Sequence, residues 1–496
     1  MDGKTLQSSF TLTHYNGGMS DFFNSLFEPA AATKGRWTAR VGVIILYLIG
    51  LAAWGWFLGW GQSLFTFHDW GEITMPRLAY LKNALQMGVL PLHISDTQTL
   101  AYVTDRFWSV PDQLLSPQIL LLPFFPLPFF VLINVWLLYT AGFLGLVWFG
   151  RKYQLSLFTF AVIHLLFNFN GHILAHYTAG HATWGGYFLF PWFVILVIEL
   201  VQNKAGWAWI SKISFLLFIV FLQGSYHQFV GMLIFLGLLV LAVPRHFWVI
   251  FKAGLFSILV SMFRVLPPFL SLNSFKLDYQ AGYPTVLAIW DSLVQSNIPG
   301  NHENWNGLTR AIGNWEFTIY IGLLAAVFLI YFGIMRTFQN SEPLQCLLAP
   351  VTGIVLLSMD DVYRYIRIYF PLPLFTGERA PARMLSLAFV FVLLLAAVQF
   401  QRWLNEKKFP TPVKVTLLLL GLMEVQGLWE NFNLWQVAKN ATAIDPFYPF
   451  DRYHWQVANH HDDKYLLALA LGLLITLVSS GWLIYRWRKE KLISTG

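Results

Sequence analysis

The residue with the clearest potential for chemistry is Asp69, which follows the first long apolar segment, 40–60, after a short aromatic stretch. Its carboxylate would lie at the boundary between membrane and water. There it can act as a general base toward a substrate whose tail stays in lipid. The spacing also fits a helix N-cap, because a helical run follows and Glu72 stands at the capping-box position. Spacing alone favours the cap, although one residue can serve in both roles.

Three histidines form the second group of candidates. His172 and His176 are four residues apart, so a helix would place them on one face, and His181 follows shortly after them. Imidazole is a preferred zinc ligand, but no glutamate stands beside His172 as it does in the helical metalloprotease motif. We therefore favour hydrogen bonds to a sugar, a phosphate or lipid headgroups over a metal site.

Arginines form the third group. Arg379 and Arg383 are four residues apart just before an apolar segment, and two planar guanidinium groups can clamp a phosphate. The alternative is pairing with nearby acids such as Glu378. Arg264 stands in an apolar run, where an ionisable residue is a functional candidate by default. Its alternative is a long side chain that reaches the outer interface.

A polar turn between two apolar segments adds two further candidates, His227 and Gln228. The turn predicts either the polar lining of a cavity or a tight hairpin with interfacial anchors. The residue types favour neither alternative over the other.

The composition is that of a membrane protein. Only 11% of the 496 residues are charged and 56% are hydrophobic, with 45 Phe and 22 Trp, whereas a soluble domain carries about twice that share of charge. The net charge of +7 is explained first by basic cytoplasmic loops, and nucleic-acid binding is the weaker interpretation. The single cysteine, Cys346, excludes an intrachain disulfide and a cysteine metal cluster. We expect no cleavable signal peptide in the polar and aromatic start of the chain.

A spanning helix needs about 20 largely apolar residues, which predicts an all-α polytopic bundle of about twelve transmembrane helices. The expected spans lie near 40–60, 126–149, 155–171, 185–201, 209–224, 228–243, 247–268, 316–335, 343–358, 384–402, 412–428 and 464–486. Most Lys and Arg then fall on one side and most Asp and Glu on the other, as the positive-inside rule requires. We therefore expect a cytoplasmic segment 1–39, a transmembrane domain 40–486 and a cytoplasmic tail 487–496, in a plasma (inner) membrane.

The outer connections are expected to be long. They lie near 61–125, 172–184, 269–315, 359–383 and 429–463. They are rich in Trp, His, Asp and Arg, and long polar loops on one side of a rigid bundle usually carry function.

In their order along the chain, these residues and their neighbours resemble the GT-C superfamily of integral membrane glycosyltransferases. The similarity is greatest to the bacterial YfhO-like and polyprenyl-phosphate-sugar mannosyltransferase-like groups. The matching pieces, within about residues 40 to 400, are Asp69 followed by Pro76-Arg77 and Gly88-x-x-Pro91-Leu92; Gly171 through Gly180-His181 to Pro191-Trp192; Gly224-x-x-His227-Gln228; Arg264-Val-Leu-Pro267 with Glu316-x-x-x-Tyr320-x-Gly322; and Glu378-Arg379-x-Pro381-x-Arg383. Each piece is weak alone, and the resemblance rests on their order.

The resemblance implies transfer of a sugar from a polyprenyl-phosphate donor to a cell-surface lipid, polymer or protein on the outer face, with Asp69 deprotonating the acceptor hydroxyl. Basic residues would meet the phosphate charge of the leaving group. Arg383, Arg379 and Arg264 are the candidates for that role, with His181 near the donor. Substrate contacts are also implied for His172, His176, His227, Gln228, Glu316 and Tyr320. No nucleotide site is needed, which agrees with the lack of a phosphate-binding or dinucleotide fingerprint.

The sequence departs from the family beside its first acid. Many relatives have a second acid directly next to the first, but here the neighbour is Trp70. Glu72, three residues from Asp69, is the candidate second catalytic acid. The Trp-Trp-Asp-Tyr-Gly signature of oligosaccharyltransferases is absent, so transfer of a whole oligosaccharide to asparagine is not expected. No metal ligand is assigned, and a divalent metal between Asp69 and the donor phosphate stays an open alternative.

Two other functions fit the same sequence. A lipid or glycolipid transporter or flippase would bind a headgroup in a cavity with Arg264 and the histidines. Acids inside the apolar segments are few, however, and Glu424 is the clearest. A non-catalytic subunit of a larger membrane assembly would use its aromatic surface for protein contacts. Movement of substrate without a chemical product would favour the first, and stable co-purification without a polyprenyl lipid would favour the second.

Overall fold

The computed structural model is almost entirely helical where it describes the chain. The described residues are 24–29, 36–62, 65, 68–94, 106–269, 280–297, 313–340, 343–370, 378–406, 409–437, 457–458 and 461–495. Within these ranges the strands are β1 (His93–Ile94) and β2 (Val457–Ala458), which pair antiparallel. The expected all-α fold class is confirmed.

Seven helices in the described ranges are long and apolar enough to cross a membrane. They are Trp37–Phe57 in α2, Leu127–Lys152 (α4), Leu157–Ala179 (α5 and α6), Ala182–Val201 (η6 and α7), Pro381–Glu406 (η13 and α19), Thr411–Trp435 (α20) and Asp463–Ile493 in α22. The pair α9 (Tyr226–Ala242) and α10 (Phe247–Val260) adds an eighth if it is one span bent by 119°. The chain is therefore a polytopic membrane protein.

The twelve predicted spans all contain helix, but not all coincide with helices of spanning length. Shorter apolar helices occupy Trp207–Leu222 (α8), Leu323–Gln339 (α14, η11 and α15) and Pro343–Leu357 (η12 and α16). Helix α8 begins directly after Gly206, α14 begins directly after Gly322, and η12 begins at Pro343. The count of about twelve stays a prediction.

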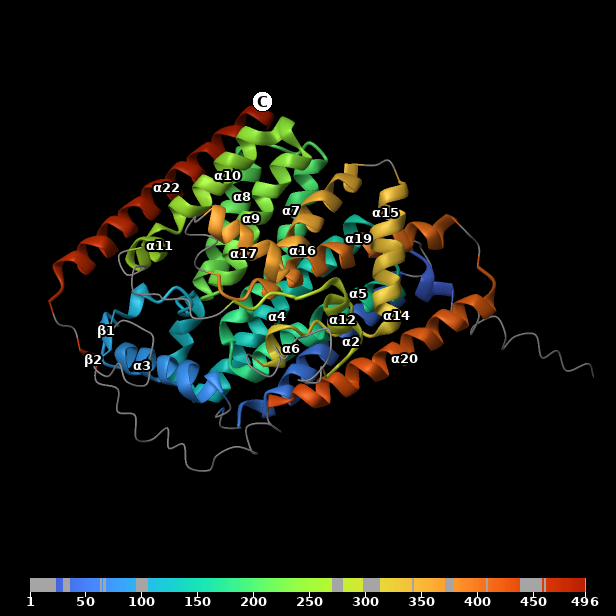
Figure 1. Cartoon of the computed structure of the whole chain (residues 1–496), viewed down its shortest axis with the longest axis horizontal. Coiled ribbons are helices and arrows are strands. Elements are labelled where there is room, and N and C mark those ends of the chain that lie inside the picture. Colours follow the sequence, from blue (N-terminus) through green and yellow to red (C-terminus); the bar gives the residue numbers. More distant parts are fainter. Residues whose placement is uncertain are drawn as a thin grey trace, which may run out of the picture.

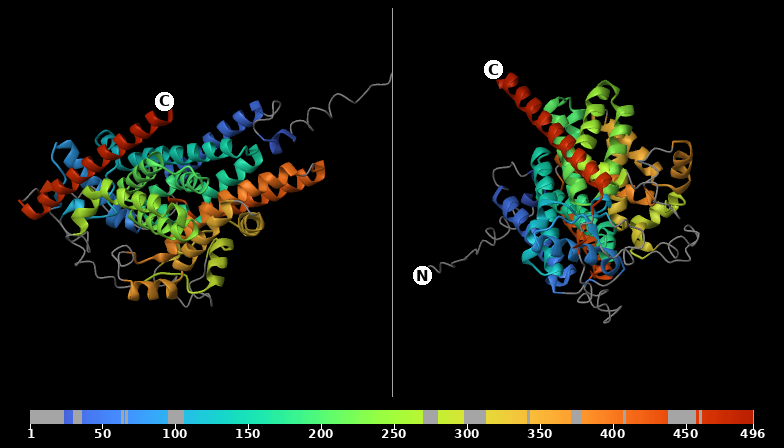
Figure 2. Two further views of the ribbon diagram at one scale, coloured as in Figure 1. Left: turned by 90° about the horizontal axis from the view of Figure 1, so that it is seen from above. Right: turned by 90° about the vertical axis from the view of Figure 1, so that its left-hand side faces the viewer.

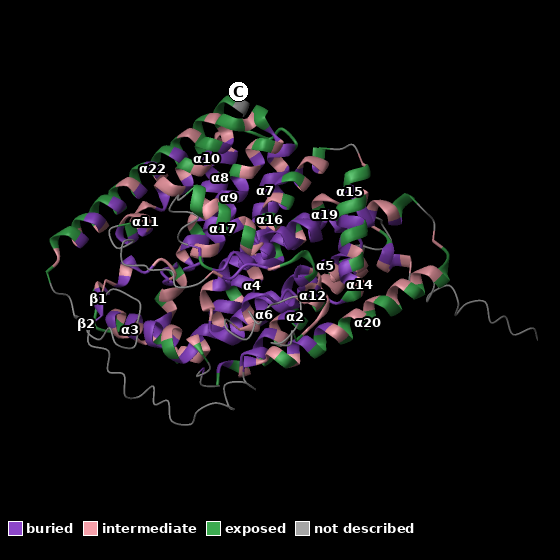
Figure 3. Cartoon of the chain, in the orientation of Figure 1, coloured by how far each residue is buried: buried purple, intermediate pink, exposed green. Residues whose placement is uncertain are grey.

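The core of the bundle is α19 (Leu385–Glu406), whose apolar window is completely buried. By contrast, only 6% of the window in α20 and 28% of that in α22 is buried. Figures 1 and 2 place these two helices at the outside of the bundle, and Figure 3 shows their outer faces exposed. Apolar side chains that face outward on such helices suit contact with lipid.

Several expected outer loops contain helices, and the loop predicted at 172–184 is wrong. The segment folds as α6 (Gly171–Ala179), all nine residues of which are buried. Asn170 begins the helix by accepting a hydrogen bond from the backbone N–H of Ile173, and Gly180 ends it in the left-handed conformation at φ +99°. The polar side chains of α6 face the protein interior, so a hydropathy pattern classified them as loop.

The other predicted outer loops are partly helical as well. The remaining described elements are η1 (Gly59–Gly61), η2 (Trp70–Thr74), α3 (Met75–Gln86), η4 (Phe107–Ser109), η5 (Pro117–Phe124), η7 (Pro244–His246), α11 (Met262–Phe269), α12 (Val286–Val294), η10 (Asn314–Glu316) and α17 (Asp360–Tyr369). Figure 1 shows α3, α6 and α12 toward one end of the bundle, with the C-terminus at the other.

Candidate functional site

Asp69 directs its carboxylate into the protein and does not cap a helix. It lies before η2 with φ −59° and ψ −17° and makes no side-chain capping hydrogen bond. Its Oδ1 lies 3.0 Å from Nδ1 of His68, and its Oδ2 lies 3.0 Å from Nε2 of His181. The capping interpretation is therefore wrong, and the carboxylate is held between two imidazoles instead.

The two imidazoles keep this carboxylate ionised. Burial alone would raise the pKa of Asp69, but hydrogen bonds from His181 and His68 outweigh it and hold that pKa well below its usual range. Asp69 in turn raises the pKa of His68. The Asp69 side chain keeps 21% of its surface exposed. It is an ionised acceptor that a substrate can still reach.

A chain of hydrogen bonds leads from Asp69 into the bundle. Nδ1 of His181 lies 2.6 Å from Nδ1 of His176, and we call Asp69, His181 and His176 the histidine chain. If His181 donates from Nε2 to the carboxylate, its Nδ1 accepts from His176. That leaves Nε2 of His176 as an acceptor, and this buried atom has no hydrogen-bond partner in the described part of the chain.

A second buried network contains the predicted arginine. Arg383 donates from Nε and Nη2 to the two carboxylate oxygens of Glu316, at 2.6 and 2.5 Å, and from Nη1 to Nε2 of His227 at 2.9 Å. Nδ1 of His227 lies 2.5 Å from Glu378. We call Glu316, Arg383, His227 and Glu378 the arginine cluster. Because arginine only donates, His227 accepts at Nε2 and donates from Nδ1 to Glu378.

Both carboxylates of the arginine cluster are ionised. Burial would raise the pKa of Glu316, but Arg383 lowers it to about 2. Burial would also raise the pKa of Glu378, but the nearby His227 is the main group that holds the pKa of Glu378 below its usual range. The side chains of Glu316 and Arg383 are only 4% and 6% exposed, so the pair is a buried, bidentate salt bridge.

Trp184 separates the histidine chain from the arginine cluster. His176 stacks on the indole ring at 4.0 Å between centroids, and the Arg383 guanidinium carbon lies 4.8 Å from the ring centroid. The indole N–H donates to Nε2 of His172 at 2.9 Å. One aromatic ring thus fixes His172, His176 and Arg383 together, and the predicted candidates from four separate motifs meet around it.

Several predicted residues lie outside these two networks. Arg264 is fully buried and donates to the backbone carbonyls of Trp108, Val110, Pro111 and Gln113. It therefore anchors that loop, and the expectation that it reaches the interface is wrong. Glu72 and Arg379 are exposed.

Tyr320 and Gln228 are placed less directly for chemistry. Tyr320 directs its hydroxyl toward Gly427, where an added Cβ would lie 2.9 Å from it. Gln228 is buried, and its Oε1 has no hydrogen-bond partner in the part of the chain that the structure describes. Neither side chain joins the histidine chain or the arginine cluster through a described hydrogen bond.

Sequence reasoning missed His68, Trp184 and Glu378 as site residues. His68 could have been found, because it is adjacent to Asp69 in the sequence. Glu378, expected only as a partner for an arginine, lies 3.9 Å from Nη1 of Arg383 and also bonds to His227. Nothing in the sequence indicates that Trp184 lies between the two networks.

The three predicted histidines do not form a metal site. Among the described residues no group of three or more His, Cys, Asp or Glu side chains is arranged to hold a metal ion. His176 and His181 instead bond to each other, and His172 accepts from an indole. Three ring nitrogens are used in these hydrogen bonds, whereas Nε2 of His176 has no partner in the described part of the chain.

Gly180 allows the close approach that brings Asp69 to His181. Its φ is +99°, and a Cβ there would overlap the backbone N of Trp70 and lie 2.6 Å from the carbonyl carbon of Asp69. We expect Gly180→Ala to lower the thermal unfolding midpoint and to separate the carboxylate from His181. The matched control is Gly88→Ala at φ +67°, where no atom lies within 4 Å. That control carries only the backbone strain, about 1–2 kcal/mol, and equal losses for both variants would contradict the close-approach argument.

The buried carboxylates predict how stability depends on pH. The pKa of Glu316 falls from its ordinary value near 4.5 to about 2 on folding, so its contribution is complete above pH 4.5 and is lost as the pH falls toward 2. One pKa unit is worth about 1.4 kcal/mol, which gives on the order of 3 kcal/mol. Thermal unfolding between pH 7 and 3 should therefore show a flat region and then a steep fall. A Glu316→Gln variant should show a shallower fall of the unfolding midpoint with pH. A fall as steep as that of the unaltered protein would contradict this assignment.

Comparison of the chain with protein-family models, with curated proteins and with solved structures finds no match. Function therefore has to be inferred from the geometry of the histidine chain and the arginine cluster.

Proposed function

We propose that the chain is a membrane glycosyltransferase of the GT-C type, which moves a sugar from a polyprenyl-phosphate donor to an acceptor hydroxyl on the outer face of the membrane. The observation that carries this proposal is Asp69. Its carboxylate is not used as a helix cap, is ionised between two imidazoles and keeps part of its surface exposed. It also lies twelve residues beyond the end of the candidate span Trp37–Phe57.

In the proposed reaction Asp69 takes the proton of the acceptor hydroxyl. The acceptor oxygen then forms a bond to the anomeric carbon of the donor sugar, and the bond between that carbon and the phosphate oxygen breaks with its electron pair on the phosphate. A carboxylate with a low pKa is a weak base, so the proton is only partly transferred in the transition state. The histidine chain holds the carboxylate in place, because His176 donates to His181 Nδ1 and His181 donates from Nε2 to Asp69, and the transferred proton stays on Asp69 until it passes to water.

The charge on the departing phosphate needs donors at a position that a substrate can reach. Arg383 is committed to Glu316 and His227, so we assign it to positioning His227 and Trp184 rather than to a phosphate clamp. Arg379, four residues earlier and exposed, is the proposed phosphate contact. His181 and His172 would then face the sugar.

The proposal includes the finer topology expected from the charges. About twelve spans with both termini in the cytoplasm would place Asp69 and the arginine cluster on the outer side, where a polyprenyl-linked donor presents its sugar. The shorter apolar helices α8, α14 to α15 and α16, with α9 and α10 each counted as a separate span, would then bring the seven long spans to twelve.

The first test is lipid extraction and native mass spectrometry on the gently purified protein. A co-purifying polyprenyl phosphate, or its sugar adduct, would support the glycosyltransferase and identify the donor sugar. Only bulk phospholipid in repeated preparations would count against it, and would favour a transporter or a non-catalytic subunit.

A further inference from the structure

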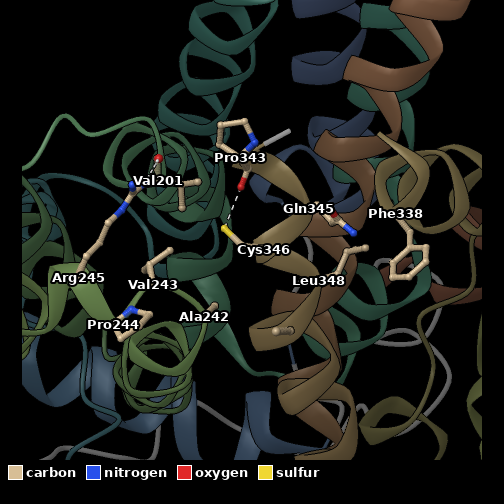
Figure 4. Close-up of a pocket in the computed structure, with 11 residues that line it drawn as sticks. Val201, Ala242, Val243, Pro244, Arg245, Phe338, Pro343, Gln345, Cys346 and Leu348 are labelled. Atoms are coloured by element: carbon tan, nitrogen blue, oxygen red, sulfur yellow. Dashed lines mark hydrogen bonds between the residues drawn. The ribbon is translucent and has the colours of Figure 1, made fainter. Parts of the chain in front are cut away.

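A cavity of about 610 Å³ lies at the opposite ends of the helices that begin at the candidate site. Helix α7 directly follows η6, which carries Trp184, and ends at Val201; helix α9 begins beside His227 and ends at Ala242. Both ends line the cavity (Figure 4). At 1.5 Å per residue, the length of α9 separates the cavity from His227 by about 25 Å.

The lining is mostly apolar. Val243, Phe338, Leu348 and their apolar neighbours form most of the wall, Gln345 adds one amide, and the described lining residues include no acid. Figure 4 shows Arg245 at one edge and Phe338 and Leu348 at the other. A cavity of this size, apolar with a single charged group, is typical of a site for an amphiphilic small molecule.

Arg245 is poorly neutralised by the protein. Its side chain is exposed, and in the described part of the chain its guanidinium makes a single, long hydrogen bond of 3.5 Å to the carbonyl of Val201 and no ion pair. A guanidinium with five N–H donors at the mouth of an apolar cavity favours the binding of an anionic ligand.

We propose that this cavity binds an anionic phospholipid of the surrounding membrane, with its phosphate against Arg245 and an acyl chain along Phe338 and Leu348. Basic pockets between transmembrane helices are known to hold acidic lipid headgroups. A peptide segment would fit less well, because its backbone groups would find few hydrogen-bond partners on an apolar wall. The proposal does not depend on the proposed glycosyltransferase activity.

The only cysteine of the chain, Cys346, lines this cavity and provides a direct reporter. The experiment measures the rate at which N-ethylmaleimide modifies the purified full-length protein in nanodiscs, by intact mass spectrometry. The discs contain either phosphatidylcholine alone or phosphatidylcholine with phosphatidylglycerol. We expect modification to slow at least several-fold when phosphatidylglycerol is present.

Two variants show whether the protection is specific. Arg245→Gln should abolish the protection, whereas Lys252→Gln, which removes a charge from α10 without touching the lining, should retain it. A general effect of the anionic surface on thiol reactivity would persist in both variants. Protection that survives Arg245→Gln, or equal rates in the two kinds of disc for the unaltered protein, would overturn the proposal.

Discussion

Replacing Asp69 by asparagine is expected to lower the rate of sugar transfer by about a hundred- to ten-thousand-fold, the usual contribution of a general base. Asparagine has nearly the same shape, and its carbonyl oxygen can still accept a hydrogen bond from His181, so the fold should survive. It cannot take a proton from the acceptor hydroxyl. The measurement is the initial rate of donor consumption, with the thermal unfolding midpoint recorded on the same preparation.

The control is Asp361→Asn, which removes the same charge from an exposed position on α17, where the side chain is 76% exposed. It should leave the rate unchanged. Asp69→Asn with a near-native melting midpoint and full activity would remove Asp69 from the role of base. A large loss of activity together with a large loss of stability would assign the residue to the fold instead.

Replacing Arg383 by methionine is expected to destabilise the protein by about 3–5 kcal/mol, because it leaves a buried carboxylate without its partner. Glu316 would lose both charge-assisted hydrogen bonds, and His227 would lose the donor to its Nε2. Thermal unfolding in one detergent, at pH 7, measures the effect. Arg383→Lys should recover only part of the loss, since a single ammonium group cannot make the bidentate contact.

The double variant Arg383→Met with Glu316→Gln separates the lost pair from lost packing. If the cost comes from an unpaired buried charge, the double variant should be more stable than the sum of the two single losses predicts. Strictly additive losses would mean that the two residues act independently, and would contradict the salt bridge as the origin of the effect.

The spans could be predicted from the sequence because a membrane permits few backbone structures. Any chain segment in hydrocarbon must satisfy its backbone hydrogen bonds internally, so long apolar stretches become helices. Each of the twelve predicted segments contains helix, although residues 318–322 of the segment 316–335 are not helical. Seven helices in the described part of the chain have spanning length. Hydropathy failed at α6, where three buried polar residues, His172, His176 and Thr178, face the interior and resemble a loop in the sequence.

Most residues of the candidate site could be predicted individually from the sequence. Which of them bond to one another could not. Asp69 and His181 are 112 residues apart, and Glu316 and Arg383 are 67 apart, so no local pattern shows that they bond. Sequence reasoning assigned Arg383 to a phosphate because it stands four residues from Arg379, and two planar guanidinium groups can clamp a phosphate. The packing around α19 instead brings Glu316 to it, and that contact depends on tertiary structure alone.

The most direct test of the account is to supply the purified protein in nanodiscs with a panel of polyprenyl-phosphate sugars, together with membrane lipids and glycolipids that carry acceptor hydroxyls, and to follow the release of free polyprenyl phosphate by mass spectrometry. We predict that the unaltered protein consumes at least one donor and that Asp69→Asn, folded to the same extent, does not. Release at equal rates by the two proteins would contradict the assignment of Asp69 as the base. If no donor of the panel were consumed, the glycosyltransferase proposal itself would be contradicted.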